Sequence, residues 1–166
     1  SSGFGWSFNV NSDYRKRFYA GFNFFKFWGT GGVIGFNSVG LSFTVVPINS
    51  LNISLSANYQ NNWRKQDQFV QNITYNNSIR TIVGQLKQET IRFTGRLNFN
   101  VTPDLTIQYY GQPFLTRPTY QQFAYVVNPM AKQYDDRFKP YTASQISLNN
   151  GRYLVDENND GNTDYS

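Results

Sequence analysis

Apolar and polar residues alternate with a period of two along most of the first 114 residues. The pattern is clearest in residues 91–101, where odd positions are apolar or glycine and even positions are Arg, Thr or Asn. Alternation of this length is typical of β-strands with two unlike faces, and helical periodicity is nearly absent. Strands are therefore predicted in about six segments, namely 4–10, 15–27, 39–45, 51–60, 91–101 and 105–112.

The connections between these segments differ in length. The turns "NSD" (11–13), "PINS" (47–50) and "TPD" (102–104) are short, whereas 28–33, 61–88 and the residues after 114 are long or rich in glycine. Short turns at one end and long polar loops at the other are typical of outer-membrane β-barrels. Within 61–88, the Asn-Asn-Ser sequence of "ITYNNSIRTIVG" predicts a hairpin tip, with two strands that continue above the membrane.

Two environments fit the apolar face of these strands. In a barrel it meets lipid and the polar face lines a wet lumen; in a soluble sandwich it meets a second sheet. The polar face is rich in Asn, Gln, Ser and Thr, which suits a lumen, and large aromatic residues gather toward strand ends as in interfacial girdles. The pattern favours the barrel, and the alternative is a soluble or surface β-sandwich that acts as a glycan-binding or adhesin module.

The predicted fold class is an all-β, antiparallel up-and-down transmembrane β-barrel with long extracellular loops. Closed barrels usually need at least eight strands, and an open sheet edge in lipid leaves backbone groups without partners. About six strands are therefore expected to be part of a larger barrel. Residues 1–114 are predicted to form barrel strands, with an extracellular hairpin extension around 61–88, and residues 115–166 a long extracellular loop with a calcium-like turn.

Composition narrows the chemistry. The 166 residues include no cysteine and no histidine, which removes thiolate ligands, imidazole ligands and the commonest general base. The net charge is +5, but the basic residues are scattered, so nucleic acid is not an expected partner. No run approaches the roughly 18 apolar residues of a membrane helix. With no convincing pair of acids either, the protein is not expected to be an enzyme.

Three stretches carry a family resemblance: "RKRFYAGFNFF", "ETIRFTGRLNFNVTPDLTIQYYGQPF" and "YLVDENNDGNTDYS". Together they resemble a family of Bacteroidota outer-membrane proteins that join an N-terminal module, similar to carbohydrate-binding family nine, to a large C-terminal β-barrel. The resemblance covers nearly all of the chain and places it in the barrel. It implies residence in the outer membrane of a Gram-negative cell, with long loops extracellular, and a role with glycans.

The sharpest local motif is "DENNDGNTD" (156–164). Its first, third and fifth positions carry oxygen-bearing side chains and glycine stands sixth, which is the D-x-N-x-D-G spacing of calcium loops. The seventh residue would offer its backbone carbonyl, and an aspartate stands ninth. Calcium takes several hard oxygens on a bent backbone, and glycine permits the bend. Ordinary polar turns use the same residues. The predicted cofactor is Ca²⁺, and its predicted ligands are Asp156, Asn158, Asp160, Asn162 and Asp164.

Other side chains have both a functional and a structural interpretation. The lumen-facing arginines could attract anions or pair with carboxylates, and aromatic residues of 115–166 could stack on sugar rings or pack the loop against itself. Asp135 and Asp136 are adjacent, so pairing with Arg137 or Lys139 is expected in place of catalysis. The arginines are Arg17, Arg92 and Arg96, and the aromatic residues are Tyr120, Phe123, Tyr125, Tyr134, Phe138, Tyr141 and Tyr153.

The resulting functional prediction is a non-enzymatic segment of an outer-membrane β-barrel that takes part in transport or serves as a scaffold for a glycan-handling surface complex. Its expected partners are outer-membrane lipid, other outer-membrane or surface proteins, and glycans.

Overall fold

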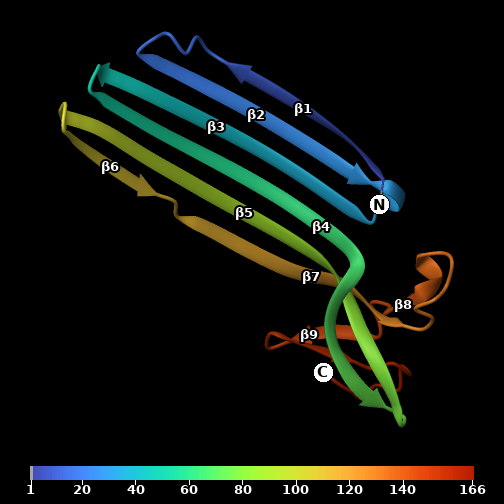
Figure 1. Ribbon diagram of the computed structural model, residues 1–166. Coiled ribbons are helices and arrows are strands. Elements are labelled where there is room, and N and C mark those ends of the chain that lie inside the picture. Colours follow the sequence, from blue (N-terminus) through green and yellow to red (C-terminus); the bar gives the residue numbers. More distant parts are fainter. Residues whose placement is uncertain (1) are drawn as a thin grey trace. The chain divides into compact units, whose positions relative to one another are not determined.

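The computed structural model describes residues 2–166, without the side chains of residues 66 and 67 (Figure 1). Ser1, which the predicted range 1–114 includes, lies outside the described residues. The all-β antiparallel prediction is confirmed, since the described chain contains strands and two single 3₁₀ turns but no α-helix. The elements are β1 (Gly3–Asn11), β2 (Phe18–Gly29), η1 (Thr30–Gly32), β3 (Ile34–Ile48), β4 (Leu51–Tyr75), β5 (Ser78–Thr102), β6 (Leu105–Gly111), β7 (Phe114–Val126), η2 (Asp135–Arg137), β8 (Phe138–Pro140), β9 (Ile146–Asn149) and β10 (Arg152–Val155).

The chain divides into two compact units. Unit 1 comprises residues 1–63 and 87–119, and unit 2 comprises residues 64–86 and 120–166. Strands β4 and β5 contribute residues to both, because each runs for 25 residues. None of the helical turns among the described residues is long and apolar enough to cross a membrane.

Unit 1 is a curled antiparallel sheet, a half-barrel, in which strands lie side by side in sequence order (Figure 1). All six predicted strand segments overlap β1 to β6, with only residues 15–17 and 112 outside the observed strands. Directly paired residues of antiparallel strands point to the same face of the sheet. The register of β1, β2 and β3 pairs apolar residues with apolar residues, so that they form rows on one face. One row crosses three strands as Phe8, Phe24 and Val39, and the next row crosses them as Val10, Phe22 and Leu41.

Burial in unit 1 is the reverse of that in a soluble protein. On β3, the polar-face residues Ser38 and Thr44 are buried, at 8% and 7% exposure. The apolar residues Leu41 and Phe43 on the opposite face are 45% and 44% exposed. The polar face therefore lies on the enclosed side of the sheet and the apolar face on its open side.

Unit 2 has an ordinary hydrophobic core. All the buried hydrophobic residues of the described chain lie in this unit: Ile82, Val83, Ala124, Tyr125 and Val155. Its first part is the tip of the β4–β5 hairpin, where Asn76 and Asn77 both have positive φ, at 49° and 57°. Two such residues define the tight turn that matches strand twist, so the predicted Asn-Asn-Ser tip is confirmed.

The range 115–166, predicted as a loop, contains β8 to β10 and nearly all of β7. Strand β7 pairs with β5 and, through its last residues, with β8. Strand β7 was not predicted from the sequence, because it contains Pro118 and a proline within a run of residues argues against a strand. The β9–β10 hairpin turns at Asn150 and Gly151, both with positive φ. That Asn-Gly pair is a standard hairpin signal which the sequence reasoning overlooked.

Candidate functional site

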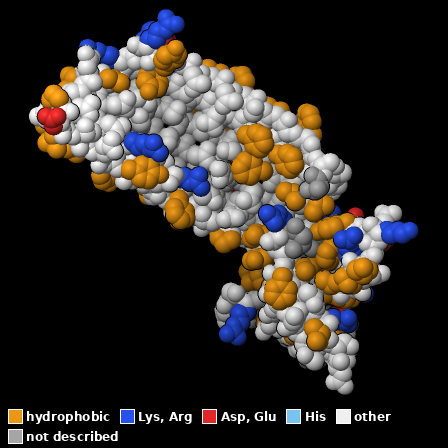
Figure 2. Space-filling view, viewed as in Figure 1, with side chains coloured by type: hydrophobic (Ala, Val, Ile, Leu, Met, Phe, Trp, Pro, Cys, Tyr) orange, Lys and Arg blue, Asp and Glu red, His pale blue; other side chains and the backbone are white. Residues whose placement is uncertain are grey.

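The polar face of unit 1 is a continuous hydrogen-bonding surface. The Thr44 and Ser54 hydroxyls lie 3.1 Å apart, and Gln112 donates to Thr94 at 3.2 Å. The guanidinium of Arg96 lies over the Tyr110 ring, 5.0 Å from its centroid. Figure 2 shows a face of this unit on which few hydrophobic side chains occupy the centre and several Lys and Arg side chains are present. Such a surface suits water and polar solutes.

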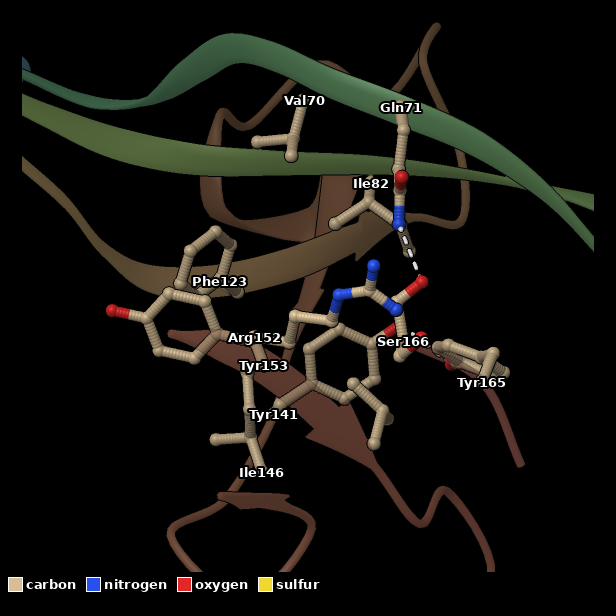
Figure 3. A pocket seen from close by; sticks show the side chains of 11 residues that line it. Val70, Gln71, Ile82, Phe123, Tyr141, Ile146, Arg152, Tyr153, Tyr165 and Ser166 are labelled. Atoms are coloured by element: carbon tan, nitrogen blue, oxygen red, sulfur yellow. Dashed lines mark hydrogen bonds between the residues drawn. The ribbon is translucent and has the colours of Figure 1, made fainter. Parts of the chain in front are cut away.

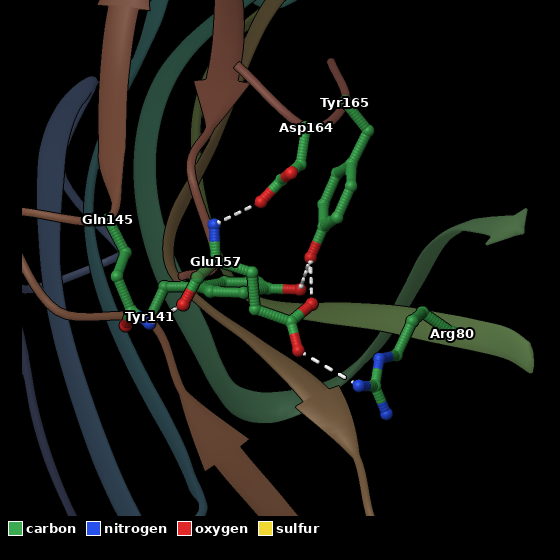
Figure 4. A network of polar contacts seen from close by, with 6 residues as sticks. All are labelled: Arg80, Tyr141, Gln145, Glu157, Asp164 and Tyr165. Carbon is green, nitrogen blue, oxygen red and sulfur yellow. Dashed lines mark hydrogen bonds and ion pairs between the residues drawn. The ribbon is translucent and has the colours of Figure 1, made fainter. Parts of the chain in front are cut away.

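Unit 2 is held together by a polar network centred on Glu157. The Glu157 carboxylate accepts hydrogen bonds from Arg80 at 2.9 Å and from the Tyr165 hydroxyl at 2.7 Å. Figure 4 shows the carboxylate between these two groups. The main chain of the same residue is also bound, because its carbonyl accepts from Gln145 at 2.7 Å and its N–H donates to Asp164 at 2.8 Å. Glu157 thereby ties the end of the described chain to strand β5.

Two tyrosines extend this network. The hydroxyls of Tyr141 and Tyr165 lie 2.8 Å apart, and Tyr165 already donates to Glu157, so Tyr141 is the donor between them. Burial raises the pKa of Tyr141 to about 12, and burial also raises the pKa of Tyr165. Both phenols therefore stay neutral at physiological pH and act as hydrogen-bond donors. Their stabilising contribution is present below pH about 10, the unfolded value, and is lost as the pH rises toward the folded values.

A cavity of about 290 Å³ lies beside this network, within unit 2 (Figure 3). Aromatic rings form much of its wall, from Phe123, Tyr141, Tyr153 and Tyr165. The Phe123 and Tyr153 rings stack at a tilt, with centroids 4.5 Å apart. The aliphatic part of the wall consists of Val70, Ile82, Ile146 and Val155.

Apart from the tyrosines, the polar residues that line the cavity are Gln71, Arg152 and Ser166. Gln71 comes from strand β4, and its amide donates weakly to the main-chain oxygen of Ser166 at 3.5 Å. Arg152, at the start of β10, reaches toward these two residues in Figure 3. Its guanidinium makes no hydrogen bond or ion pair with the described part of the chain. The cavity therefore combines flat apolar walls with one available cation.

The aromatic residues singled out from the sequence pack mostly against one another. Besides the Phe123–Tyr153 pair, Tyr125 lies 5.5 Å from Tyr141 and Tyr134 lies 5.1 Å from Phe138, measured between ring centroids. This packing is the structural alternative considered above. Phe123, Tyr141 and Tyr153 also line the cavity, so packing and exposure to a ligand coincide for these three.

The predicted calcium loop is a compact turn in which main-chain N–H groups donate hydrogen bonds to the carboxylate oxygens of Asp156 and Asp160. Asp156 accepts from the N–H groups of Asp160 and Gly161 at 3.1 and 2.8 Å. Asp160 accepts from Asn162 at 2.8 Å, and this bond, with a second from the Asn158 amide, lowers the Asp160 pKa. Gly161 has φ +87°, the bend for which glycine was expected.

The loop does not gather all five predicted ligands. Asp156, Asn158, Asp160 and Asn162 hydrogen-bond with one another or through Gly161, whereas Asp164 binds the N–H of Glu157. Among the described residues, no group of three or more Asp, Glu, His or Cys side chains is close enough to hold a metal ion. Calcium binding by this loop stays a prediction.

Calcium at millimolar concentration is expected to stabilise unit 2 by about 1 kcal/mol, given dissociation constants of about 10⁻⁴ M for extracellular sites. Thermal unfolding with calcium and with a chelator measures this difference. The Asp156→Asn variant keeps an oxygen for only one of the two N–H groups, those of Asp160 and Gly161, and removes the charge. It should abolish the difference between calcium and chelator, which is read separately from any loss of stability common to both conditions. Magnesium is the control and should have little effect. Equal stability in calcium and chelator would rule out the site.

Two of the other charged residues singled out from the sequence, Asp135 and Arg17, have structural partners. Asp135 pairs with Lys65 at 3.6 Å, so the expected pairing with Arg137 or Lys139 is wrong for this carboxylate. Lys65 lies 70 positions away, and no local pattern connects the two. Arg17 donates to the Pro47 carbonyl at 2.9 Å and so braces a turn. Arg92 is on the polar face of β5 by alternation with Phe93.

Comparisons with protein-family profiles, with curated proteins and with solved structures found no match for this chain. The geometry therefore carries the functional argument. The residues that sequence reasoning missed are Arg80, Gln145, Glu157 and Tyr165 in the network, and Gln71 and Arg152 in the cavity. Arg80 and Glu157 are 77 positions apart, and Gln71 and its partner Ser166 are 95 positions apart. No spacing rule relates positions that only tertiary folding brings together.

Proposed function

We propose that this chain is part of the wall of an outer-membrane β-barrel and is not an enzyme. Its apolar face contacts lipid hydrocarbon, its polar face lines a lumen, and residues 64–86 and 120–166 lie outside the cell. The protein acts in transport, or as the anchor of a surface complex that handles glycans. The resemblance to the Bacteroidota outer-membrane family is consistent with this role.

The observation that carries the proposal is the inverted burial of unit 1. Phe4, Leu55 and Phe93 are 69%, 59% and 55% exposed, on three different strands of the apolar face. In water, contiguous exposure of this kind has a large hydrophobic cost and promotes aggregation. In a bilayer the same face is favourable, because lipid-facing and lumen-facing residues alternate along barrel strands. The sandwich alternative needs a second layer over this face, and none of the described strands of unit 1 supplies it.

One end of the apolar face carries residues suited to a membrane interface. Trp28 stacks with Phe4, with ring centroids 6.4 Å apart, and the Lys26 ammonium lies 4.5 Å from the Trp28 ring centroid. Tryptophan concentrates at headgroup level, and lysine can reach water from that depth by extending its side chain. The single charge on this part of β2 is therefore placed where lipid tolerates it.

The strand lengths fit the same topology. About 9–11 tilted residues cross a bilayer, and β4 and β5 each have 25. Both strands begin or end at a short turn, and their excess length leads to the Asn76–Asn77 tip. The excess is then outside the hydrocarbon, where polar residues and a conventional core are expected.

Single cysteines test the proposal directly, because the natural chain has none. Cysteines at Leu41 and Phe43, labelled with a fluorescent probe in vesicles, should be quenched by lipid-attached quenchers. Matched labels at Ser42 and Ser56 on the polar face should be quenched by water-soluble iodide instead. Equal quenching at odd and even positions, or a protein that stays monomeric without detergent, would contradict the membrane assignment.

A further inference from the structure

We propose that the cavity of unit 2 binds a small ligand made of one six-membered ring bearing a carboxylate. This proposal does not depend on the membrane assignment, because the cavity is formed entirely within unit 2. Both a sugar acid and an aromatic acid have this chemistry, and the experiment below distinguishes them.

The size and walls of the cavity indicate the ring. Ligand pockets usually have volumes of about 300–1,000 Å³ and mostly apolar walls with few polar groups. This cavity has about 290 Å³, which favours a single ring over a chain of rings. The tilted Phe123 and Tyr153 rings offer flat surfaces at one end, as Figure 3 shows. Flat faces of this kind pack best against another ring.

The polar groups indicate the carboxylate. The Tyr141 and Tyr165 hydroxyls are already hydrogen-bonded to each other and to Glu157. These two residues can therefore contact a ligand with their rings, but their hydroxyl hydrogens are not available to it. The groups that remain are Arg152 and the amide of Gln71, which is held only by a long hydrogen bond. A guanidinium binds a carboxylate through two parallel hydrogen bonds, and such charge-assisted bonds are the strong ones. The Glu157 carboxylate is taken by Arg80 at 2.9 Å, and the Asp164 carboxylate accepts from the Glu157 N–H at 2.8 Å.

The walls are prearranged for binding. Glu157, Arg80 and Tyr165 fix the side of the cavity formed by Tyr141 and Tyr165, and Ile82 and Val155 beneath it are buried, at 5% and 6% exposure. Gly84 also lies under the aromatic end, where an added Cβ would come within 3.3 Å of Phe123. A ligand therefore needs to order little besides the Arg152 side chain, which reduces the entropic cost of binding.

Titration of the full chain in detergent with four probes tests the proposal. Galacturonate and 4-hydroxybenzoate carry the acid on a sugar and on an aromatic ring, and galactose and 4-hydroxybenzyl alcohol are their neutral counterparts. Saturation-transfer NMR, read at the ligand ring protons, should show one acid binding at least tenfold more tightly than its neutral counterpart. The preferred acid identifies the ligand source. Absence of binding by both acids at millimolar concentration would overturn the proposal.

Variants separate the two parts of the site. Arg152→Gln should weaken binding of the acid at least tenfold and remove its advantage over the neutral probe, whereas Lys132→Gln, which removes an equal charge outside the cavity, should change nothing. Tyr153→Phe should bind normally and Tyr153→Ala should bind at least fivefold more weakly. Arg152 is exposed and has no hydrogen-bond or ion-pair partner among the described residues, so its variant is expected to fold. Unchanged affinity in Arg152→Gln would overturn the proposal whatever Tyr153→Ala shows.

Discussion

The Leu55→Arg variant is expected to lose about 2–4 kcal/mol of unfolding free energy in lipid vesicles, the cost of arginine at the midplane of a barrel's lipid face. Leu55 is the fifth residue of β4, which starts at Leu51 directly after a two-residue turn. A crossing takes about 9–11 residues, so this position is close to the bilayer centre. Denaturant unfolding from phosphatidylcholine vesicles, followed by tryptophan fluorescence, measures the loss.

Ser56→Arg is the matched control, because it places the same side chain on the next residue of the same strand but on the polar face. Ser56 is half-buried on this hydrogen-bonding surface. In a barrel the surface faces a wet lumen that hydrates the guanidinium, so a change below about 1 kcal/mol is expected. In a soluble protein, Leu55→Arg would be nearly harmless, since the native side chain is already 59% exposed. Similar effects of the two substitutions would therefore refute lipid contact at this face.

The Glu157→Ala variant is expected to destabilise unit 2 by about 2–3 kcal/mol. Removing one partner of a buried ion pair usually costs about 3–5 kcal/mol, because the other charge is left without compensation. Here the Glu157 side chain is 12% exposed and that of Arg80 is 29% exposed, so water screens part of the loss. The Tyr165 hydroxyl loses its acceptor as well.

Hydrogen exchange gives the local readout for Glu157→Ala. The Val155 N–H donates to the Tyr165 carbonyl at 2.8 Å, so its protection reports opening of this part of unit 2. Adding Arg80→Met to Glu157→Ala should recover part of the loss, because no buried charge then remains. Lys65→Ala, which breaks the exposed ion pair with Asp135, is the control and should cost less than about 1 kcal/mol. Unchanged protection of Val155 in Glu157→Ala would show that the network is not what holds the unit together.

Strands and faces of unit 1 could be read from the sequence, because they depend on near neighbours. Successive residues of a strand point to opposite faces, so the alternation at 91–101 defines both a strand and its apolar side. The Asn76–Asn77 turn was equally readable, since few residues tolerate positive φ. Strand β7 was missed, because Pro118 interrupts its pattern and its pairing with β5 is not local.

Local residue patterns were sufficient to predict that the chain is β-rich, that its strands have one apolar and one polar face, and that Asp156 to Asp164 form a bent polar turn. Which face is enclosed became clear from the three-dimensional structure, since alternation is the same for a sheet that curls either way. It also decided that Arg80 meets Glu157 and that Phe123, Tyr153 and Arg152 share one cavity. Those contacts join residues far apart along the chain, and their positions depend on strand pairing and packing, which local periodicity does not encode.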